Sequence, residues 1–274
     1  MSFDHIGFIG AGNMASSLIS GLVADGYPPD HLHVSDINQD ALDALKQRLG
    51  VATATSNLAV AEKASVLVLA VKPQSLKAVL EALAPALKKK PPLLISIAAG
   101  ISCASIARWA GGQAAIVRTM PNTPAMVGCG ATGLFATEAV DERQRNLAEE
   151  ILRAVGLTVW VDKEPLIDAV TALSGSGPAY FFLLMQAMEE AGIRLGLDPQ
   201  TARLLSEQTA LGAGKIAIET GAGPLELRRR VTSPGGTTEQ AIATFEAGGF
   251  REMVDVAMQA AARRAKALSE QLGD

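Results

Sequence analysis

An apolar segment that runs into a glycine-rich turn stands close to the start of the chain. Residues 5–9 read His-Ile-Gly-Phe-Ile, and Gly-Ala-Gly-Asn-Met-Ala follows at residues 10–15. This G-x-G-x-x-A spacing predicts a strand that turns sharply into a helix. Gly10 permits the turn, Gly12 lets the backbone approach a pyrophosphate, and Ala15 lets the helix pack closely on the strand. The free N–H groups at the start of the helix would face the phosphates.

The residues after this turn favour dinucleotide binding over an ordinary strand-to-helix turn, which the motif alone also fits. A helical run at residues 14–24 ends at Asp25-Gly26, and a second predicted strand ends at Asp36. The Asp36 carboxylate lies about 20 residues after the turn, where it could accept a hydrogen bond from a ribose hydroxyl.

Strand-like and helical segments alternate through the first 160 or so residues. The apolar run at 65–71 is continuous, which is typical of a strand covered on both faces in a parallel sheet. Further strands are predicted at 93–97, 115–119, 131–136 and 158–161, and helices at 40–49, 74–87 and 141–155. This alternation predicts a Rossmann-like doubly wound α/β sheet, with ligands beyond the carboxyl ends of its strands.

The pattern changes at residue 164, because strand-like runs stop and helical segments continue to residue 272. We therefore predict a dinucleotide-binding domain at residues 1–162 and an all-helical substrate and dimerisation domain at residues 163–274. Within the latter, Tyr180-Phe181-Phe182-Leu183-Leu184-Met185 is apolar on nearly every face of a helix. We expect a second subunit to cover this helix; the alternative is a central helix wrapped by its own neighbours.

Charge and composition exclude several classes of partner. The chain carries 24 Lys and Arg against 28 Asp and Glu, a formal charge of -4, so we expect no nucleic-acid partner. The start of the chain lacks signal-peptide features, and no apolar run approaches the roughly 18 residues of a membrane helix. The two cysteines, Cys103 and Cys129, are expected to be reduced thiols. We expect a soluble cytoplasmic protein without a membrane partner.

The histidines limit the chemistry of the predicted site. His5, His31 and His33 lie in or beside the first two strands, away from the loops at the carboxyl edge. No H-E-x-x-H motif or Cys/His cluster is present, so no metal site is expected. Hydride transfer without a metal or a histidine acid needs a substrate that is already electrophilic, such as a protonated imine.

A second glycine-rich stretch leads into a helix at residues 231–240. Two glycines before two threonines can form an anion cradle, in which the N–H groups of Gly236, Thr237 and Thr238 would point at a small carboxylate. Thr237 to Gln240 fits the spacing of a capping box. A capped helix without any ligand fits the same spacing, so the alternative stays open.

Six motifs carry a resemblance to a known family. They are Gly7–Met14, Ala70–Pro73, Ser96–Gly100, Met120–Pro124, Ser174–Tyr180 and Ser233–Thr238. On these residues the chain resembles the pyrroline-5-carboxylate reductases, and the match spans the whole chain. The resemblance implies NAD(P)H-dependent reduction of 1-pyrroline-5-carboxylate to L-proline, the last step of proline biosynthesis, by hydride transfer to a protonated cyclic imine.

The resemblance also implies a set of site residues. NADPH, with NADH as the alternative, would be bound by Gly10, Ala11, Gly12, Asn13, Met14, Ser35, Asp36, Asn57, Ala70, Val71, Lys72 and Pro73, and Asn122 would lie near the nicotinamide. The substrate would be bound by Ser233, Gly235, Gly236, Thr237 and Thr238, with Thr238 hydrogen-bonded to the ring nitrogen. The site would lie at the interface of a homodimer, which could group into a higher homo-oligomer.

The choice between the two cofactors stays open in the sequence. Related folds that bind a 2′-phosphate often place an arginine just after the second strand, whereas Ile37 follows Asp36 here. Asp36 could accept from the 2′-hydroxyl of NADH, or it could turn away while Ser35 and Asn38 bind a phosphate.

Two rival functions remain. A β-hydroxy-acid dehydrogenase has a similar two-domain plan and a G-S-G-x-x-x-K motif with a catalytic lysine; here Phe181 stands where that lysine belongs, and Lys215 is far along the next helix. A cofactor-binding module without turnover, such as a redox sensor, would bind the nucleotide and reduce no imine.

Overall fold

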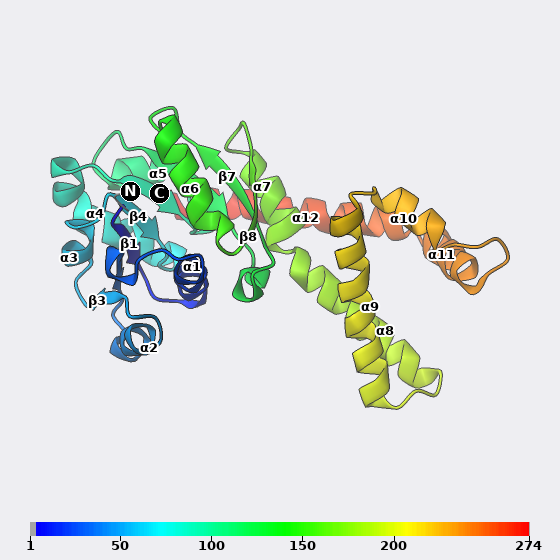
Figure 1. Ribbon diagram of the computed structural model, residues 1–274. Coiled ribbons are helices and arrows are strands. Elements are labelled where there is room, and N and C mark those ends of the chain that lie inside the picture. The colour runs from blue at the N-terminus through cyan, green and yellow to red at the C-terminus, as the bar shows by residue number, and fades with distance from the viewer. Residues whose placement is uncertain (1–3, 274) are drawn as a thin grey trace. The chain divides into compact units, whose positions relative to one another are not determined.

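A computed structural model describes residues 4–273. The chain forms two compact units (Figure 1). The first unit contains two segments of the chain, one that ends at Ser176 and one that begins at Ala261. The second unit spans Gly177–Ala260. These limits differ from the expected boundary at residue 162, because the helical turns that follow it contact strands β6 and β7 of the first unit.

The first unit is built on an eight-stranded sheet in the order β3-β2-β1-β4-β5-β6-β7-β8. The strands are β1 Ile6–Ile9, β2 Leu32–Ser35, β3 Ala52–Ala54, β4 Val66–Leu69, β5 Leu93–Ser96, β6 Ile116–Met120, β7 Gly130–Ala136 and β8 Gly156–Trp160. Neighbouring strands are parallel except β6 and β7, which are antiparallel. The predicted doubly wound α/β sheet is confirmed, with one antiparallel step.

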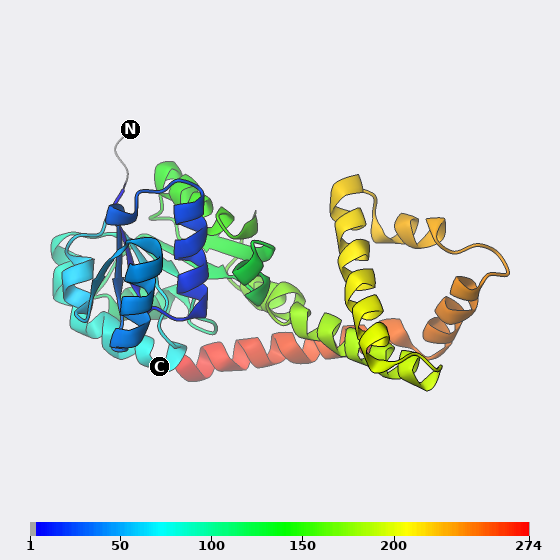
Figure 2. The same ribbon diagram turned by 60° about the horizontal axis from the view of Figure 1, so that its bottom comes forward.

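Helices cover both faces of this sheet (Figures 1 and 2). One face packs on α1 Asn13–Ala24, α2 Gln39–Leu49 and α6 Glu142–Arg153. The other packs on α3 Asn57–Ala61, α4 Pro73–Lys89 and α5 Cys103–Trp109. All four residues of β1 and of β4 are buried, which explains why these strands read as continuous apolar runs.

The helical part of the chain begins with α7 Leu166–Val170 and a π-helical turn at Thr171–Gly175. The helices that follow are α8 Gly177–Arg194, α9 Pro199–Thr220, α10 Pro224–Arg230, α11 Thr237–Ala247 and α12 Phe250–Leu272. The end of α12 belongs to the first unit, where Leu272 packs against the core beside α4 and α5.

Helix α8 is apolar and largely exposed in the single chain. The side chains of Phe181, Phe182 and Leu183 are 63%, 62% and 67% exposed. The neighbouring helices of the same chain therefore do not wrap α8, contrary to the alternative considered for this segment. A contiguous exposed apolar surface of this kind marks an interaction site.

The helical run Leu166–Arg194 is also long and apolar enough to cross a membrane, by length and composition alone. Only 17% of its apolar window is buried. Apolar helices at subunit interfaces have the same composition and exposure when one chain is viewed alone.

Candidate active site

The glycine-rich turn lies where β1 meets α1. Gly10 has a φ of +108°, and a Cβ at this position would lie 2.7 Å from the carbonyl oxygen of Ala70. Its N–H donates to the carbonyl of Ser35 at 2.7 Å. Gly10 therefore joins the ends of three neighbouring strands, and any larger residue would be strained and would clash with backbone.

Gly12 plays a different part in the same turn. It is the N-cap of α1, no side chain caps the helix, and a Cβ at Gly12 would meet nothing within 4 Å. The first N–H groups of the helix thus stay open to a ligand, and the helix dipole favours a negative charge there. This arrangement fits the pyrophosphate of a dinucleotide.

The Asp36 carboxylate lies against this turn, directly after β2. One carboxylate oxygen accepts from the N–H of Ala11 at 2.7 Å, and the other accepts from the N–H of Asn38 at 2.8 Å. Ile37 between them is 98% exposed. The carboxylate is thus fixed beside the phosphate turn, where an acid that binds a ribose hydroxyl belongs.

Ser35 and Asn38 are both engaged within the protein. The Ser35 side chain is fully buried, and its hydroxyl donates to the carbonyl of Phe8 at 3.4 Å. The Asn38 side chain caps α2 by accepting from the N–H of Ala41 at 3.3 Å. The hypothesis that Ser35 binds a phosphate with its hydroxyl therefore finds no support; its backbone carbonyl instead holds Gly10.

The remaining predicted cofactor residues lie at this edge of the sheet. Asn13 and Met14 begin α1, Asn57 begins α3 after β3, and Ala70 to Pro73 join β4 to α4. Ala70 donates its N–H to the carbonyl of Ile9 at 2.8 Å, which fixes this loop beside the glycine-rich turn. The carboxyl ends of parallel strands bring these residues to one edge.

Asn122 follows β6 at the same edge, and its side chain is 8% exposed. Its Nδ2 donates to the carbonyl of Ser174 at 2.9 Å, and its Oδ1 accepts from the N–H of Ala131 at 2.8 Å. Both polar ends of the amide are therefore used inside the first unit.

The predicted substrate loop lies in the second unit, between α10 and α11. Gly236 is the N-cap of α11 and Thr237 is its first residue, so the expected capping box from Thr237 to Gln240 is wrong. The N–H of Gly236 donates to the carbonyl of Ser233 at 3.0 Å, and the N–H of Gly235 donates to Glu239 Oε2 at 2.7 Å. The amides of Thr237 and Thr238 stand in the first turn of α11, where α-helices leave N–H groups without intrahelical acceptors.

An ion-pair network on β6 was missed in the sequence. Arg118 is 5% exposed and pairs with Glu164 at 2.9 Å and with Asp168 at 3.6 Å. Glu164 also accepts from the backbone N–H of Cys103 at 2.8 Å, at the start of α5. Burial raises the pKa of Asp168, and Arg118 opposes that rise. The signal was a charged residue, Arg118, in the middle of a predicted strand of the parallel sheet.

The three histidines gather near the amino ends of β1 and β2. His5 Nδ1 lies 3.0 Å from His33 Nε2, and the His5 ring stacks on His31 with centroids 4.3 Å apart. Burial lowers the pKa of His33. Among residues 4–273, no group of three or more His, Cys, Asp or Glu side chains could hold a metal ion.

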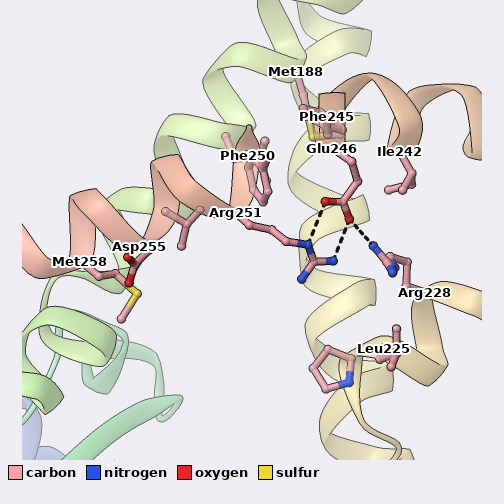
Figure 3. Close-up of a pocket in the computed structure, with 13 residues that line it drawn as sticks. Met188, Leu225, Arg228, Ile242, Phe245, Glu246, Phe250, Arg251, Asp255 and Met258 are labelled. Atoms are coloured by element: carbon pink, nitrogen blue, oxygen red, sulfur yellow. Dashed lines mark hydrogen bonds and ion pairs between the residues drawn. The ribbon is translucent and has the colours of Figure 1, made fainter. Parts of the chain in front are cut away.

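The second unit contains a mainly apolar hollow of about 810 Å³ (Figure 3). Glu246 lies on its wall and accepts from Arg228 at 2.8 Å and from Arg251 at 2.7 Å. Hydrogen bonds from these two guanidinium groups lower the pKa of Glu246 to about 2. Apolar side chains of α8, α10, α11 and α12 line most of the rest, among them Met188, Phe245 and Phe250.

A doubly wound sheet with an open helix terminus and an acid after β2 defines the class of dinucleotide-dependent oxidoreductases. Residues 5–100 match the family model described as NADP oxidoreductase coenzyme F420-dependent, and residues 164–268 match the one described as pyrroline-5-carboxylate reductase dimerisation. The chain is 52% identical over 273 residues to a pyrroline-5-carboxylate reductase of Pseudomonas aeruginosa, with 100% of both chains covered. It belongs to the pyrroline-5-carboxylate reductase family.

Solved structures agree with this assignment. A pyrroline-5-carboxylate reductase from Coxiella burnetii is 51% identical, with a TM-score of 0.95 over 98% of this chain and 99% of that one. A pyrroline carboxylate reductase of Plasmodium falciparum, solved with NADP bound, is 28% identical, with a TM-score of 0.85 over 98% and 99%. The family resemblance inferred from the six motifs is confirmed.

Proposed function

We propose that this protein reduces 1-pyrroline-5-carboxylate to L-proline with NADPH. The observation that carries the proposal is the end-to-end match to a reductase of this name in P. aeruginosa. The geometry supports it, since the first unit presents an open dinucleotide edge and the second presents a glycine-rich loop at the start of α11.

In this proposal the cofactor supplies a hydride and the chain supplies binding and orientation. The first N–H groups of α1 bind the pyrophosphate, and Asp36 lies beside the ribose. The amides of Thr237 and Thr238 bind the substrate carboxylate, and the Thr238 hydroxyl accepts from the iminium N–H. The product amine takes no proton in the transfer step, so the scheme needs no histidine acid.

We propose a homodimer with the active site at its interface, working in the cytoplasm. The match to a dimerisation family over residues 164–268 and the exposed apolar side chains of α8 support the dimer. The hollow in the second unit offers further apolar surface that a second copy can cover.

Three activities separate the proposal from its rivals. Oxidation of NADPH and NADH is measured with 1-pyrroline-5-carboxylate, and reduction of NADP⁺ with 3-hydroxy acids. We expect turnover only with the imine. Turnover only with hydroxy acids would support a β-hydroxy-acid dehydrogenase, and cofactor binding without any turnover would support a sensor module.

Replacing Gly12 with valine should weaken NADPH binding roughly hundredfold while the fold persists. The added side chain meets open space in the free protein but would stand between the backbone and the pyrophosphate. Fluorescence titration and thermal unfolding measure the two effects. Gly10→Ala should instead lower thermal stability, and equal NADPH affinity of Gly12→Val and the wild type would contradict this placement of the phosphates.

Replacing Asp36 with serine should raise the NADPH-to-NADH ratio of kcat/KM roughly tenfold. A 2′-phosphate beside a fixed carboxylate is repelled, and unit charges about 4 Å apart interact by about 1 kcal/mol in water and more near a protein surface. Asp43→Ser on α2 serves as the control, because it removes a carboxylate that accepts a hydrogen bond from the Gln39 side chain. An unchanged ratio would show that Asp36 does not face the ribose.

Thr238→Ala should lower kcat/KM roughly 10- to 150-fold, the effect of one hydrogen bond to a charged group of about 1.5–3 kcal/mol. Thr238→Ser should restore most of the activity, because it restores the hydroxyl. Steady-state kinetics of both variants measure these changes in kcat/KM. A loss beyond about ten-thousandfold for alanine would indicate direct acid catalysis, and wild-type kinetics would remove Thr238 from the site.

A further inference from the structure

The helical run that ends the first unit contains a π-helical turn at Thr171–Gly175, where the N–H of Ser176 donates to the carbonyl of Thr171 at 2.8 Å. Such turns are rare and are often found at functional sites. Pro178 follows closely. In an α-helix the carbonyl of Ser174 would accept from the N–H of residue 178, but proline has none. This carbonyl therefore needs another donor.

Asn122 supplies that donor from its side chain. Its Nδ2 donates to the Ser174 carbonyl, and its Oδ1 accepts from Ala131 at the start of β7. One buried amide thus joins the loop after β6, the strand β7 and the π-helical turn. We call these two hydrogen bonds the Asn122 bridge.

The packing around the bridge leaves little freedom. A Cβ at Gly133 of β7 would lie 2.6 Å from Val170 Cγ1, and one at Gly175 would lie 2.7 Å from Met120 Cε. The helical segment therefore lies directly on β6 and β7, with glycine where the two approach most closely. In such a close contact, a small shift of the π-helical turn would also move the loop that carries Asn122.

We propose that Asn122 is a positioning residue that replaces, from the side of the sheet, the backbone hydrogen bond that Pro178 cannot make. The bridge holds the loop after β6 in the arrangement that hydride transfer requires. The pyrophosphate is assigned to the glycine-rich turn and the ribose to Asp36, so loss of the bridge should lower kcat and leave cofactor affinity nearly unchanged. The kinetic part of this inference rests on the proposed reductase activity.

A double-mutant cycle tests the bridge. In its ionised form the Asn122→Asp side chain keeps an acceptor for Ala131 and lacks the donor for Ser174. Pro178→Ala returns the backbone N–H that an α-helix would pair with the Ser174 carbonyl. We expect Asn122→Asp to lower kcat roughly 10- to 100-fold, with the dissociation constant of NADPH changed less than about threefold. Pro178→Ala alone should stay within about threefold of the wild type, and the double variant should regain most of the lost kcat.

Two matched controls isolate the effect. Asn146→Asp adds the same charge at an exposed position on α6, and Pro85→Ala removes an exposed proline inside α4. Neither should change kcat, and Pro85→Ala should not rescue Asn122→Asp. A failure of Pro178→Ala to rescue kcat, or a loss of NADPH affinity as large as the loss of kcat, would overturn the proposal and indicate direct contact of Asn122 with the nicotinamide.

Thermal unfolding of the wild type, Asn122→Asp, Pro178→Ala and the double variant tests the bridge without a measurement of turnover. Asn122→Asp should lower Tm, and Pro178→Ala should restore part of the loss. If the wild type lacked reductase activity, the proposed function would fail, whereas this rescue of Tm would still establish the bridge. If Pro178→Ala restores Tm but Asn122→Asp alone has the kcat of the wild type, the positioning role is overturned. If Pro178→Ala does not restore Tm, the bridge itself is overturned.

Discussion

Replacing Arg118 with methionine is expected to lower the free energy of unfolding by about 3–5 kcal/mol. The guanidinium is almost fully buried on β6 and is paired with Glu164 and Asp168. Their carboxylates are only 23% and 19% exposed, so methionine would leave two partly buried carboxylates without the arginine that pairs with both. Glu164 also accepts a hydrogen bond from the start of α5, so the loss of Arg118 would disturb this contact as well as the ion pairs. Urea unfolding measures the loss.

Arg203→Met is the matched control, because Arg203 pairs with Glu207 one turn later on α9 and both side chains are exposed, at 67% and 49%. It should lower the free energy of unfolding far less than Arg118→Met does, because an exposed ion pair contributes little to stability. A triple variant, Arg118→Met with Glu164→Gln and Asp168→Asn, should recover part of the loss, since it removes the uncompensated charges. If Arg118→Met is no more destabilising than Arg203→Met, the ion pairs of Arg118 with Glu164 and Asp168 do not stabilise the fold.

Substituting glutamate for both Phe181 and Phe182 is expected to convert the oligomer into a monomer. Each ring is more than 60% exposed in the single chain, and burying one phenylalanine contributes about 1.5–3 kcal/mol. Because only the exposed part of each ring remains to be buried, four rings in a dimer would contribute about 4–7 kcal/mol, a large part of the 8.2 kcal/mol that corresponds to about micromolar affinity. Reductase activity should fall with the dimer, because the proposed site lies at its interface. Light scattering and NADPH oxidation measure both.

Leu157→Glu provides the control for this surface. Leu157 is 66% exposed on β8, in the other unit, and its replacement should leave the oligomer intact. The phenylalanine variant should still bind NADPH, since the glycine-rich turn lies in the first unit. An oligomer that survives both glutamates would show that α8 does not form the interface.

Strands that form continuous apolar runs and long amphipathic helices were predictable from the sequence, and short elements without such a pattern were not. The strands β1 and β4 and the helices α1 and α4 lie close to their predicted limits. The elements β3, α3 and α5 were missed because they have only 3, 5 and 7 residues, too few to show a period. The antiparallel pairing of β7 with β6 depends on contacts between strands, which a pattern along one strand does not reveal.

In the site, too, some residues could be placed from the sequence and others could not. Asp36 could be placed beside the glycine-rich turn because the spacing of the motif fixes it there. The partners of Asn122 could not be found, since they come together only when β6, β7 and the π-helical turn pack. The N-cap of α11 was misplaced by one residue because Gly236 adopts the extended backbone of a cap, which glycine and threonine can both take.

Transfer of deuterium from the cofactor to the product shows directly whether this protein reduces the imine by hydride transfer. The protein is incubated with 1-pyrroline-5-carboxylate and NADPH deuterated at C4 of the nicotinamide, on each face in turn, and the proline is analysed by mass spectrometry and NMR. We expect one deuterium at C5 of L-proline from one of the two labelled cofactors. Proline without deuterium from either cofactor, or no proline at all, would contradict it.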